Sequence, residues 1–231
     1  MKLKFLGNGS GFSDSHNGCF FTNDNDMYFI DCSLLNLNKM IDLNLSGYDN
    51  VHVIITHMHD DHVSGLGLLI QKLYYLSGKK IDIIASEKLM SDIVCDLTIK
   101  GVDSSMYTLS EEAALNNFTS ILTSHTPQLE GKCFGYSFDL EDKHIVYTGD
   151  TNTLEPFYPY ISEGSEVYVD MSAVYGVVHL KYNECCGQLE DISKVADVYL
   201  MHMDNEEAIK AQISGTNLKI AELYSEDERM R

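Results

Sequence analysis

Three histidines and two aspartates fall within six consecutive positions of this chain, in the segment HMHDDH at residues 57–62. The apolar run VIIT comes directly before it, so His57 should end a buried strand and the other side chains should lie on the turn that follows. Zn²⁺ prefers imidazole nitrogen and carboxylate oxygen as ligands. His57 and His59 are two positions apart in an extended segment, so their side chains can point to the same side and face one ion. Asp61 and His62 lie past the turn and can reach a second ion.

A pair of ions needs more ligands than one turn supplies, and it needs a carboxylate that can bridge. The chain offers them at the ends of three further apolar strands, in the segments LTSHTP, VYTGDT and YLMHMD, as His125, Asp150 and His202. The sequence therefore predicts a dinuclear metal site. We interpret the isolated histidines as surface or core residues: His16, His52 and His144. We expect the glycine-rich segment GNGSGFSDSHNG, which lacks the spacing of a nucleotide-phosphate fingerprint, to form a flexible rim of the site. For His16 in this segment, a substrate contact is the alternative.

Strands and helices have to position these residues, and the hydrophobic periodicity predicts both in alternation. With 231 residues, 44% of them hydrophobic, we expect one compact domain that spans residues 1–231. The expected strands are 2–7, 19–23, 27–32, 51–57, 80–86, 118–125, 133–140, 144–150, 166–171, 197–202 and 218–224, and the expected helices are 34–45, 63–76, 87–99, 183–195 and one from 205.

The second half of the chain repeats features of the first half. YFIDC contains Asp31 as VYTGD contains Asp150, and the segments IITHMHDD and YLMHMDNE make His57 a counterpart of His202. Two such halves, each a small sheet covered by helices on its outer face, would pack sheet against sheet and gather the polar strand ends at one edge. Chance similarity between short strands is the alternative.

The ordered set THMHDDH, SHT, TGDT and a strand-terminal histidine resembles the metallo-β-lactamase superfamily, and the resemblance extends from LKFLGNGSGF to LMHMD. It implies an α/β fold, an αββα sandwich with a dimetal site at one edge of the two sheets. It also implies that Asp150 bridges the ions and that Asp31 is a buried neighbour. The other ligands would divide between a first ion, bound by His57, His59 and His125, and a second ion, bound by Asp61, His62 and His202.

A site with a bridging aspartate between two histidine-rich groups resembles the sites of the hydrolase branches of this superfamily. The β-lactamases with a cysteine ligand place it where Asp150 stands, which argues against drug hydrolysis. Two ions would hold a hydroxide between them and clamp the oxygens of a phosphodiester for in-line attack. We expect two divalent ions, Zn²⁺ first and Mn²⁺ or iron as alternatives, because histidine and aspartate sites accept all three.

The segment VDMSAVYGVVHLKYNE resembles the branch that contains ribonuclease Z and cyclic-nucleotide phosphodiesterases. In that branch an acidic residue ends a strand, and a loop that contains a histidine follows. Asp170 and His179 have this arrangement here, and His179 lies 23 positions before His202. His179 would contact the phosphate and protonate the leaving oxygen, so Asp61 and His179 are the candidate catalytic residues. Lys181 departs from the Ser or Thr that commonly caps the next helix, so a plain helix-entry role for His179 stays open.

The tRNA-processing members of this branch carry an extra arm between the third motif and the bridging aspartate, whereas only 24 residues separate His125 from Asp150 here. The formal net charge of −19 also disfavours long nucleic acid, which needs a basic stripe. Cyclic nucleotides or similar small phosphodiesters fit better, in cellular signalling or in phage-encoded anti-Pycsar proteins that destroy defence signals. A thioester or lactone hydrolase and a ligand-binding module without activity are the alternatives.

Four aromatic residues after the bridging aspartate allow two interpretations. They stack a base in the pocket, or they are core or dimer contacts, which we favour: Phe157, Tyr158, Tyr160 and Tyr175.

No run reaches the roughly 18 to 20 apolar residues of a membrane helix. Six scattered cysteines without an evident signal segment indicate a cytoplasmic protein, in the host cytoplasm if it is phage-encoded. The family resemblance alone implies a homodimer.

Overall fold

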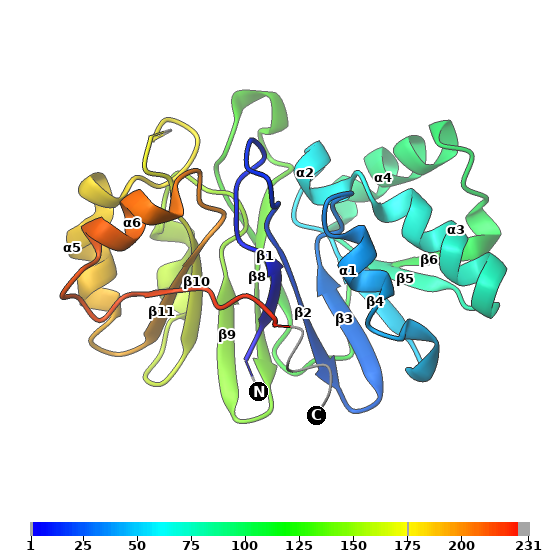
Figure 1. Ribbon diagram of the computed structural model, residues 1–231, viewed down its shortest axis with the longest axis horizontal. Coiled ribbons are helices and arrows are strands. Elements are labelled where there is room, and N and C mark those ends of the chain that lie inside the picture. Colours follow the sequence, from blue (N-terminus) through cyan, green and yellow to red (C-terminus); the bar gives the residue numbers. More distant parts are fainter. Residues whose placement is uncertain (1, 175, 226–231) are drawn as a thin grey trace.

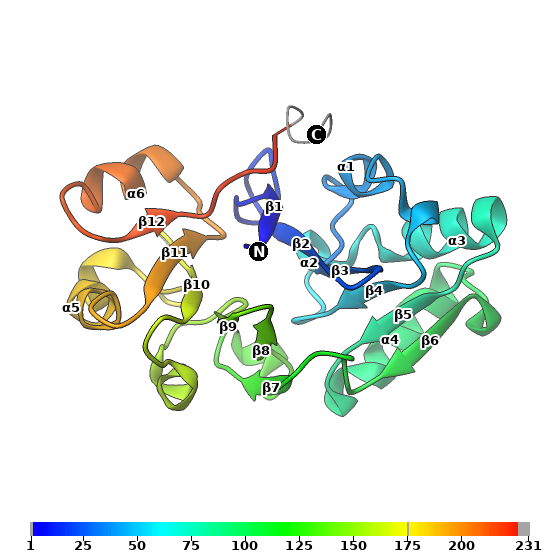
Figure 2. The same ribbon diagram turned by 90° about the horizontal axis from the view of Figure 1, so that it is seen from below.

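The computed structural model describes residues 2–174 and 176–225. In this part of the chain, two six-stranded sheets pack face to face, and helices cover their outer sides (Figures 1 and 2). This arrangement is the expected αββα sandwich. The covering helices are α5 (Tyr182–Ile192) and α6 (Glu206–Gln212), at the left of Figure 1, and α1 (Leu37–Ile41), α3 (Leu66–Ser77) and α4 (Glu87–Ile99), at its right.

The first sheet begins with antiparallel strands and continues with parallel ones. β1 pairs antiparallel with β2 and β2 with β3, whereas β3 to β6 run parallel to one another. A parallel connection needs a crossover, which α3 and α4 supply on one face. The strands follow one another in chain order: β1 (Lys4–Gly7), β2 (Gly18–Asn23), β3 (Asp26–Ile30), β4 (Val51–Ile54), β5 (Ile81–Ile84) and β6 (Tyr107–Ser110).

The second sheet has the same plan. β7 to β9 are antiparallel, and β9 to β12 are parallel. Its strands are again neighbours in chain order: β7 (Thr119–Leu122), β8 (Phe134–Leu140), β9 (Lys143–Tyr147), β10 (Glu166–Asp170), β11 (Asp197–Met201) and β12 (Lys219–Ile220). The shared plan supports a duplication. However, the strand beside β9 is β10, so the structural counterpart of β4 is the strand that ends at Asp170, and the expected pairing of His57 with His202 is wrong.

Aromatic rings fill the layer between the two sheets. The ring of Phe21 on β2 stacks on Tyr28 of β3 at a centroid distance of 5.1 Å and on Phe138 of β8 at 5.2 Å. All three side chains are buried. Burial of this apolar surface is the main favourable contribution to folding. A second core cluster, which includes Leu189 of α5 and Ile209 of α6, fills the outer face of the second sheet.

The expected helix at 63–76 is divided in the structure. A short helix, α2 (Asp60–Val63), precedes α3, and the two are separated at Gly65. The amide of Gly65 donates to the carbonyl of Cys32 at 2.9 Å, and a Cβ at this position would stand 2.7 Å from the carbonyl oxygen of Ser33. The close contact with the chain after β3 therefore interrupts the helix.

Two other expectations fail for local reasons. The expected helix at 34–45 is reduced to α1 and the 3₁₀ turn η1 (Leu45–Gly47), because Asn44 between them has a left-handed φ of 54°. β6 was not expected; it is a four-residue edge strand whose sequence, YTLS, has little hydrophobic pattern. Among the described residues, no helix is long and apolar enough to cross a membrane.

Candidate metal centre

Strand ends and tight turns position the site at the upper edge of the sandwich, where α2 and the loop after β1 lie in Figure 1. β4 ends at Ile54, and His59, the residue before α2, has an extended backbone. His202 follows β11 directly and has a left-handed φ of 54°. Gly149, before Asp150, has a φ of 58°, which glycine adopts easily because it lacks a Cβ.

Three imidazoles face one another in the first group of ligands. The Nδ1 atom of His59 lies 3.0 Å from Nε2 of His57 and 3.3 Å from Nε2 of His125. The Oδ2 atom of Asp150 lies 3.7 Å from Nε2 of His57 and 3.6 Å from Nε2 of His125. Four donor atoms from three separate segments therefore surround one position.

The second group consists of Asp61, His62, His202 and again Asp150. The Oδ2 atom of Asp61 lies 3.3 Å from Nε2 of His62 and 3.2 Å from Nε2 of His202. The two oxygens of Asp150 complete the group, since Oδ1 lies 3.4 Å from Nε2 of His62 and Oδ2 lies 3.4 Å from Nε2 of His202. Because Asp150 belongs to both groups, its carboxylate is placed as a bridge.

The spacing of these atoms fits divalent ions. Ligand atoms about 2.0 Å from a tetrahedral zinc ion lie about 3.3 Å from one another, which matches the separations within both groups. In addition, Nε2 of His62 and Oδ1 of Asp150 are buried without a hydrogen-bond partner among the described residues. Buried polar atoms of this kind are costly unless something binds them. The structure therefore brings all seven expected ligands together, in the division that the family resemblance implied.

Burial keeps the first group in the state that binds metal. Desolvation lowers the pKa of His57 well below its ordinary value and also lowers the pKa of His59 and His125, so these imidazoles are neutral. Burial opposes ionisation of Asp150, but the neighbouring imidazoles, first that of His202, hold the pKa of this carboxyl well below its usual range. Neutral nitrogens and an ionised carboxylate are ligands ready for a cation.

Asp31 binds the Nδ1 side of the His62 ring, whereas Nε2 faces Asp61 and Asp150. Nδ1 of His62 donates to Oδ2 of Asp31 at 2.7 Å, so Nε2 of His62 is left as the ligand atom. The amide and the hydroxyl of Thr56 donate to Oδ1 of Asp31 at 2.9 and 3.1 Å. Asp31 is thus the buried neighbour that the resemblance implied.

His179 lies beside the bridging carboxylate. Its Nδ1 is 4.0 Å from Oδ2 of Asp150 and donates to Oδ2 of Asp170 at 2.7 Å. Burial would lower the pKa of His179, but the charge of Asp170 and this hydrogen bond raise it above its ordinary value. His179 is therefore suited to hold and donate a proton. Lys181 stands at the N-cap of α5, and its side chain makes no capping bond.

Five of the seven expected ligands line a cavity of about 470 Å³, a volume typical of sites for small molecules: His59, Asp61, His125, Asp150 and His202. The lining also includes residues that the sequence did not single out, among them Phe12, Val178 and Asp204. Asp204 accepts hydrogen bonds from the amides of Ala173 and Val174 at 2.7 and 3.0 Å, so it holds the start of the loop that carries His179. The one sequence signal for Asp204 is its position two residues after His202.

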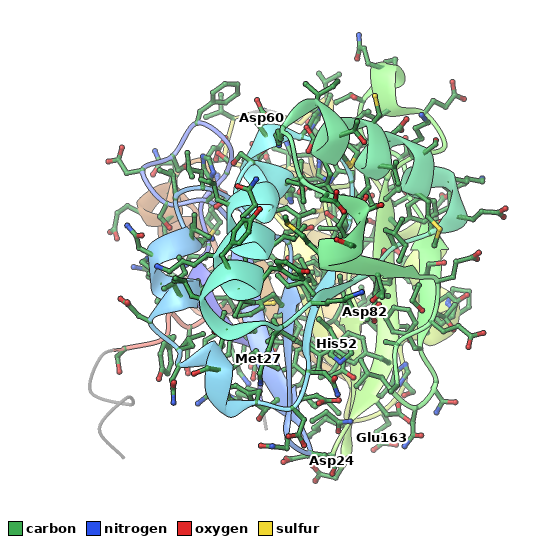
Figure 3. The ribbon with its side chains drawn as sticks, turned by 90° about the vertical axis from the view of Figure 1, so that its right-hand side faces the viewer. Asp24, Met27, His52, Asp60, Asp82 and Glu163 are labelled. Atoms are coloured by element: carbon green, nitrogen blue, oxygen red, sulfur yellow. The ribbon has the colours of Figure 1, made fainter. Side chains whose placement is uncertain are left out.

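Of the remaining histidines, His52 and His144 lie away from the cavity as interpreted, whereas His16 does not. His16 lines the cavity, and its Nδ1 is buried with no hydrogen-bond partner in the described chain, so a substrate contact stays a prediction. Nδ1 of His52 lies 3.1 Å from Oδ2 of Asp82, and Figure 3 shows this pair well below Asp60, which marks the metal edge. His144 lies on β9, where its Nδ1 is 2.6 Å from Oδ1 of Asp139.

The aromatic segment after Asp150 does not contribute to the cavity. Phe157 is fully buried in the second core cluster, and Tyr160 packs against that cluster. Tyr158 lines a separate groove together with Ile161 and Gln188. The core interpretation holds for Phe157 and Tyr160, whereas the proposed position in the pocket is wrong for all three. Tyr175 lies outside the described residues.

Comparison with known proteins gives consistent matches over most of the chain. The family model described as Anti-Pycsar protein Apyc1 matches residues 1–222. A protein of that name from Bacillus phage vB_BsuM-Goe3 is 26% identical, with 89% of this chain and 90% of the relative covered. A second protein of that name, from Paenibacillus sp. (strain J14), is 28% identical, with 68% of this chain and 69% of the relative covered. The metallo-β-lactamase fold protein YhfI from Bacillus subtilis superposes with a TM-score of 0.74 at 15% identity, over 94% of each chain.

Proposed function

Because the chain belongs to the anti-Pycsar protein Apyc1 family, we propose that it is a phosphodiesterase that opens 3′,5′-cyclic nucleotides to linear monophosphates. It has the metallo-β-lactamase fold of metal-dependent hydrolases. The observation that carries the proposal is the pair of ligand groups that share Asp150, with Nδ1 of His179 4.0 Å from the shared carboxylate. We propose two Zn²⁺ ions as the resident metals.

The seven ligands would hold the ions, and His179 would act on the leaving oxygen. When bound, two divalent ions activate a water molecule and neutralise charge on phosphate oxygens. Since Nδ1 of His179 donates to Asp170, its Nε2 is the atom that can transfer a proton to the ribose oxygen as the P–O bond breaks. Asp170 keeps the ring in this orientation and stabilises its protonated form.

Cyclic mononucleotides fit the site better than tRNA. The segment between His125 and Asp150 forms the short turn η3 (Pro127–Leu129) and the hairpin of β8 and β9, with no arm that could grip a tRNA. The net charge of −19 opposes binding of a long polyanion. We propose that the cellular role is the removal of cyclic-nucleotide signals used in antiviral defence, as the family name suggests.

The test is product chromatography after incubation of purified protein of measured metal content with the 3′,5′-cyclic forms of AMP, GMP, CMP and UMP. We expect linear monophosphates, and we expect chelator to abolish their formation. The His59→Ala and Asp150→Ala variants should be soluble and inactive, whereas His144→Ala, which changes a histidine away from the cavity, should retain activity. No conversion by a protein that carries two metal ions per chain would overturn the proposal.

A further inference from the structure

The cavity extends from the metal ligands to the loop between β1 and β2, drawn in dark blue at the top of Figure 1. Ser10, Gly11 and Phe12 from this loop line it. The described residues of the lining include no lysine or arginine. A nucleotide held here therefore has no lysine or arginine to bind its phosphate, which depends on the ions and on His179.

Backbone contacts fix the loop beside the second ligand group. The amide of Ser10 donates to the carbonyl of Met203, the residue after His202, at 3.0 Å, and the amide of Ser13 donates to the carbonyl of Ser10 at 3.0 Å. Gly11 lies against Asp61, since a Cβ at this position would stand 2.8 Å from Oδ2 of Asp61. Phe12 thus occupies a defined place one residue from a contact with a ligand of the second ion.

Phe12 presents an apolar ring at this position. Its side chain is 94% exposed although it lines the cavity, and Val178 adds a second apolar side chain to the same lining. Bases stack on aromatic rings in a way that tolerates different sequences, because every base has a π face. The expected aromatic residues Phe157, Tyr158 and Tyr160 do not line the cavity, so they do not offer such a surface there.

We propose that Phe12 is a substrate-binding residue whose ring stacks on the base of the bound nucleotide while the phosphate lies at the ligands around Asp150. This inference rests on the proposed function. It assigns to the loop after β1 the recognition of a planar heterocycle, which any of the four bases can supply.

Kinetics provide the first test. We expect Phe12→Ala to raise the KM for cyclic AMP about tenfold, with kcat changed less than twofold, and Phe12→Tyr to restore the KM. For the 3,5-cyclic phosphate of 1-deoxyribose, which has no base, the same substitution should leave KM unchanged. Tyr75→Ala is the matched control, because Tyr75 is also an exposed aromatic residue, 69% accessible, but lies on α3. An unchanged KM for cyclic AMP in Phe12→Ala would overturn the inference.

A binding measurement separates this inference from the proposed function. The chain contains no tryptophan, so the Phe12→Trp variant carries a single indole at the place of the proposed stacking. Titration of the metal-loaded variant with 5′-AMP should quench its emission to saturation, and ribose 5-phosphate should not. If cyclic nucleotides are not hydrolysed but AMP, and not ribose 5-phosphate, quenches the indole emission, the proposed phosphodiesterase function is wrong and base stacking by residue 12 is supported. If both ligands quench equally, or neither does, base stacking is overturned.

Discussion

His125 and Val178 are joined across the site, because Nδ1 of the imidazole donates to the backbone carbonyl at 2.8 Å. The proton on Nδ1 leaves Nε2 as the atom that faces His59 and Asp150. Val178 precedes His179, so one hydrogen bond connects a ligand of the first ion to the loop of the proposed proton donor. The position of the loop should therefore respond to the metal.

Removal of the metal should loosen this loop. Without an ion at Nε2, His125 loses one of the two interactions that fix its ring, and its bond to Val178 no longer holds the loop as firmly. We expect chelator to raise amide hydrogen exchange of residues 176–181 severalfold, as measured by mass spectrometry. The peptide that covers α4 serves as the internal control. Equal protection of residues 176–181 with and without metal would contradict the coupling.

The pair formed by His179 and Asp170 predicts a pH dependence. Burial lowers the pKa of His179, but Asp170 raises it to a net value above the ordinary one, so the protonated donor persists to a higher pH than a free imidazole would and activity should fall on the alkaline side. Asp170→Asn removes the charge and should move this alkaline limb about one pH unit lower. His179→Ala should reduce kcat by about 10²- to 10⁴-fold and remove the limb.

Metal analysis is the control for Asp170→Asn. Oδ1 of Asp170 lies 3.3 Å from Nδ1 of His202, so the substitution also touches a ligand of the second ion. The pH profile is compared only between preparations that carry equal metal. An alkaline limb at the same pH in both proteins would show that His179 is not the titrating donor.

Gly149 places the bridging carboxylate, and Gly149→Ala should displace it. The residue has a φ of 58°, and a Cβ would stand 2.6 Å from the carbonyl oxygen of Phe134. We expect a loss of about 1–3 kcal/mol in unfolding free energy, measured by denaturant titration, together with a lower metal content. Gly187→Ala is the matched control, since a Cβ at this position on α5 would meet no atom within 4 Å and alanine favours a helix. Equal stability of the two variants would contradict the steric argument.

The clustering of the seven candidate ligands could be predicted because each is a polar residue at the end of an apolar strand or on the turn that follows it, and parallel strands end at one edge of a sheet. The helix at 87–99 was also predicted with the bounds that it has in the structure, since it combines an apolar periodicity with clear ends. The break at Gly65 could not be predicted, because it depends on a contact with Ser33 and Cys32, residues distant in sequence.

The place of the aromatic residues was also beyond the sequence. Phe157 lies in a segment rich in aromatic rings near the bridging aspartate, which is compatible with a pocket and with a core. Phe12 lies in the glycine-rich segment that was expected at the rim of the site, but it stands alone among small polar residues and gave no signal of its own. Only the three-dimensional structure shows that Phe157 is covered by other side chains and that Phe12 lines the cavity.

Asp82 should stabilise the fold in a pH-dependent manner that is independent of the metal site. It accepts hydrogen bonds from Thr108 at 2.7 Å and from Nδ1 of His52 at 3.1 Å, and the bond with His52 is the first cause of its lowered pKa. Figure 3 shows Asp82 and His52 side by side, away from Asp60. Because the pKa is lower in the folded state than the ordinary 3.8, the stabilisation is present above that value and is lost as the pH falls through the folded-state pKa.

We therefore expect Asp82→Asn to lower the unfolding free energy by about 1 kcal/mol at pH 6, and we expect the difference from the unsubstituted protein to shrink below pH 4. Denaturant titration at both pH values measures it. Asp96→Asn is the matched control, because the bond between Asp96 and Lys100 is an exposed pair of the kind that contributes little. A difference for Asp82→Asn that stays constant from pH 6 to pH 3 would show that the charge of Asp82 does not carry the stabilisation.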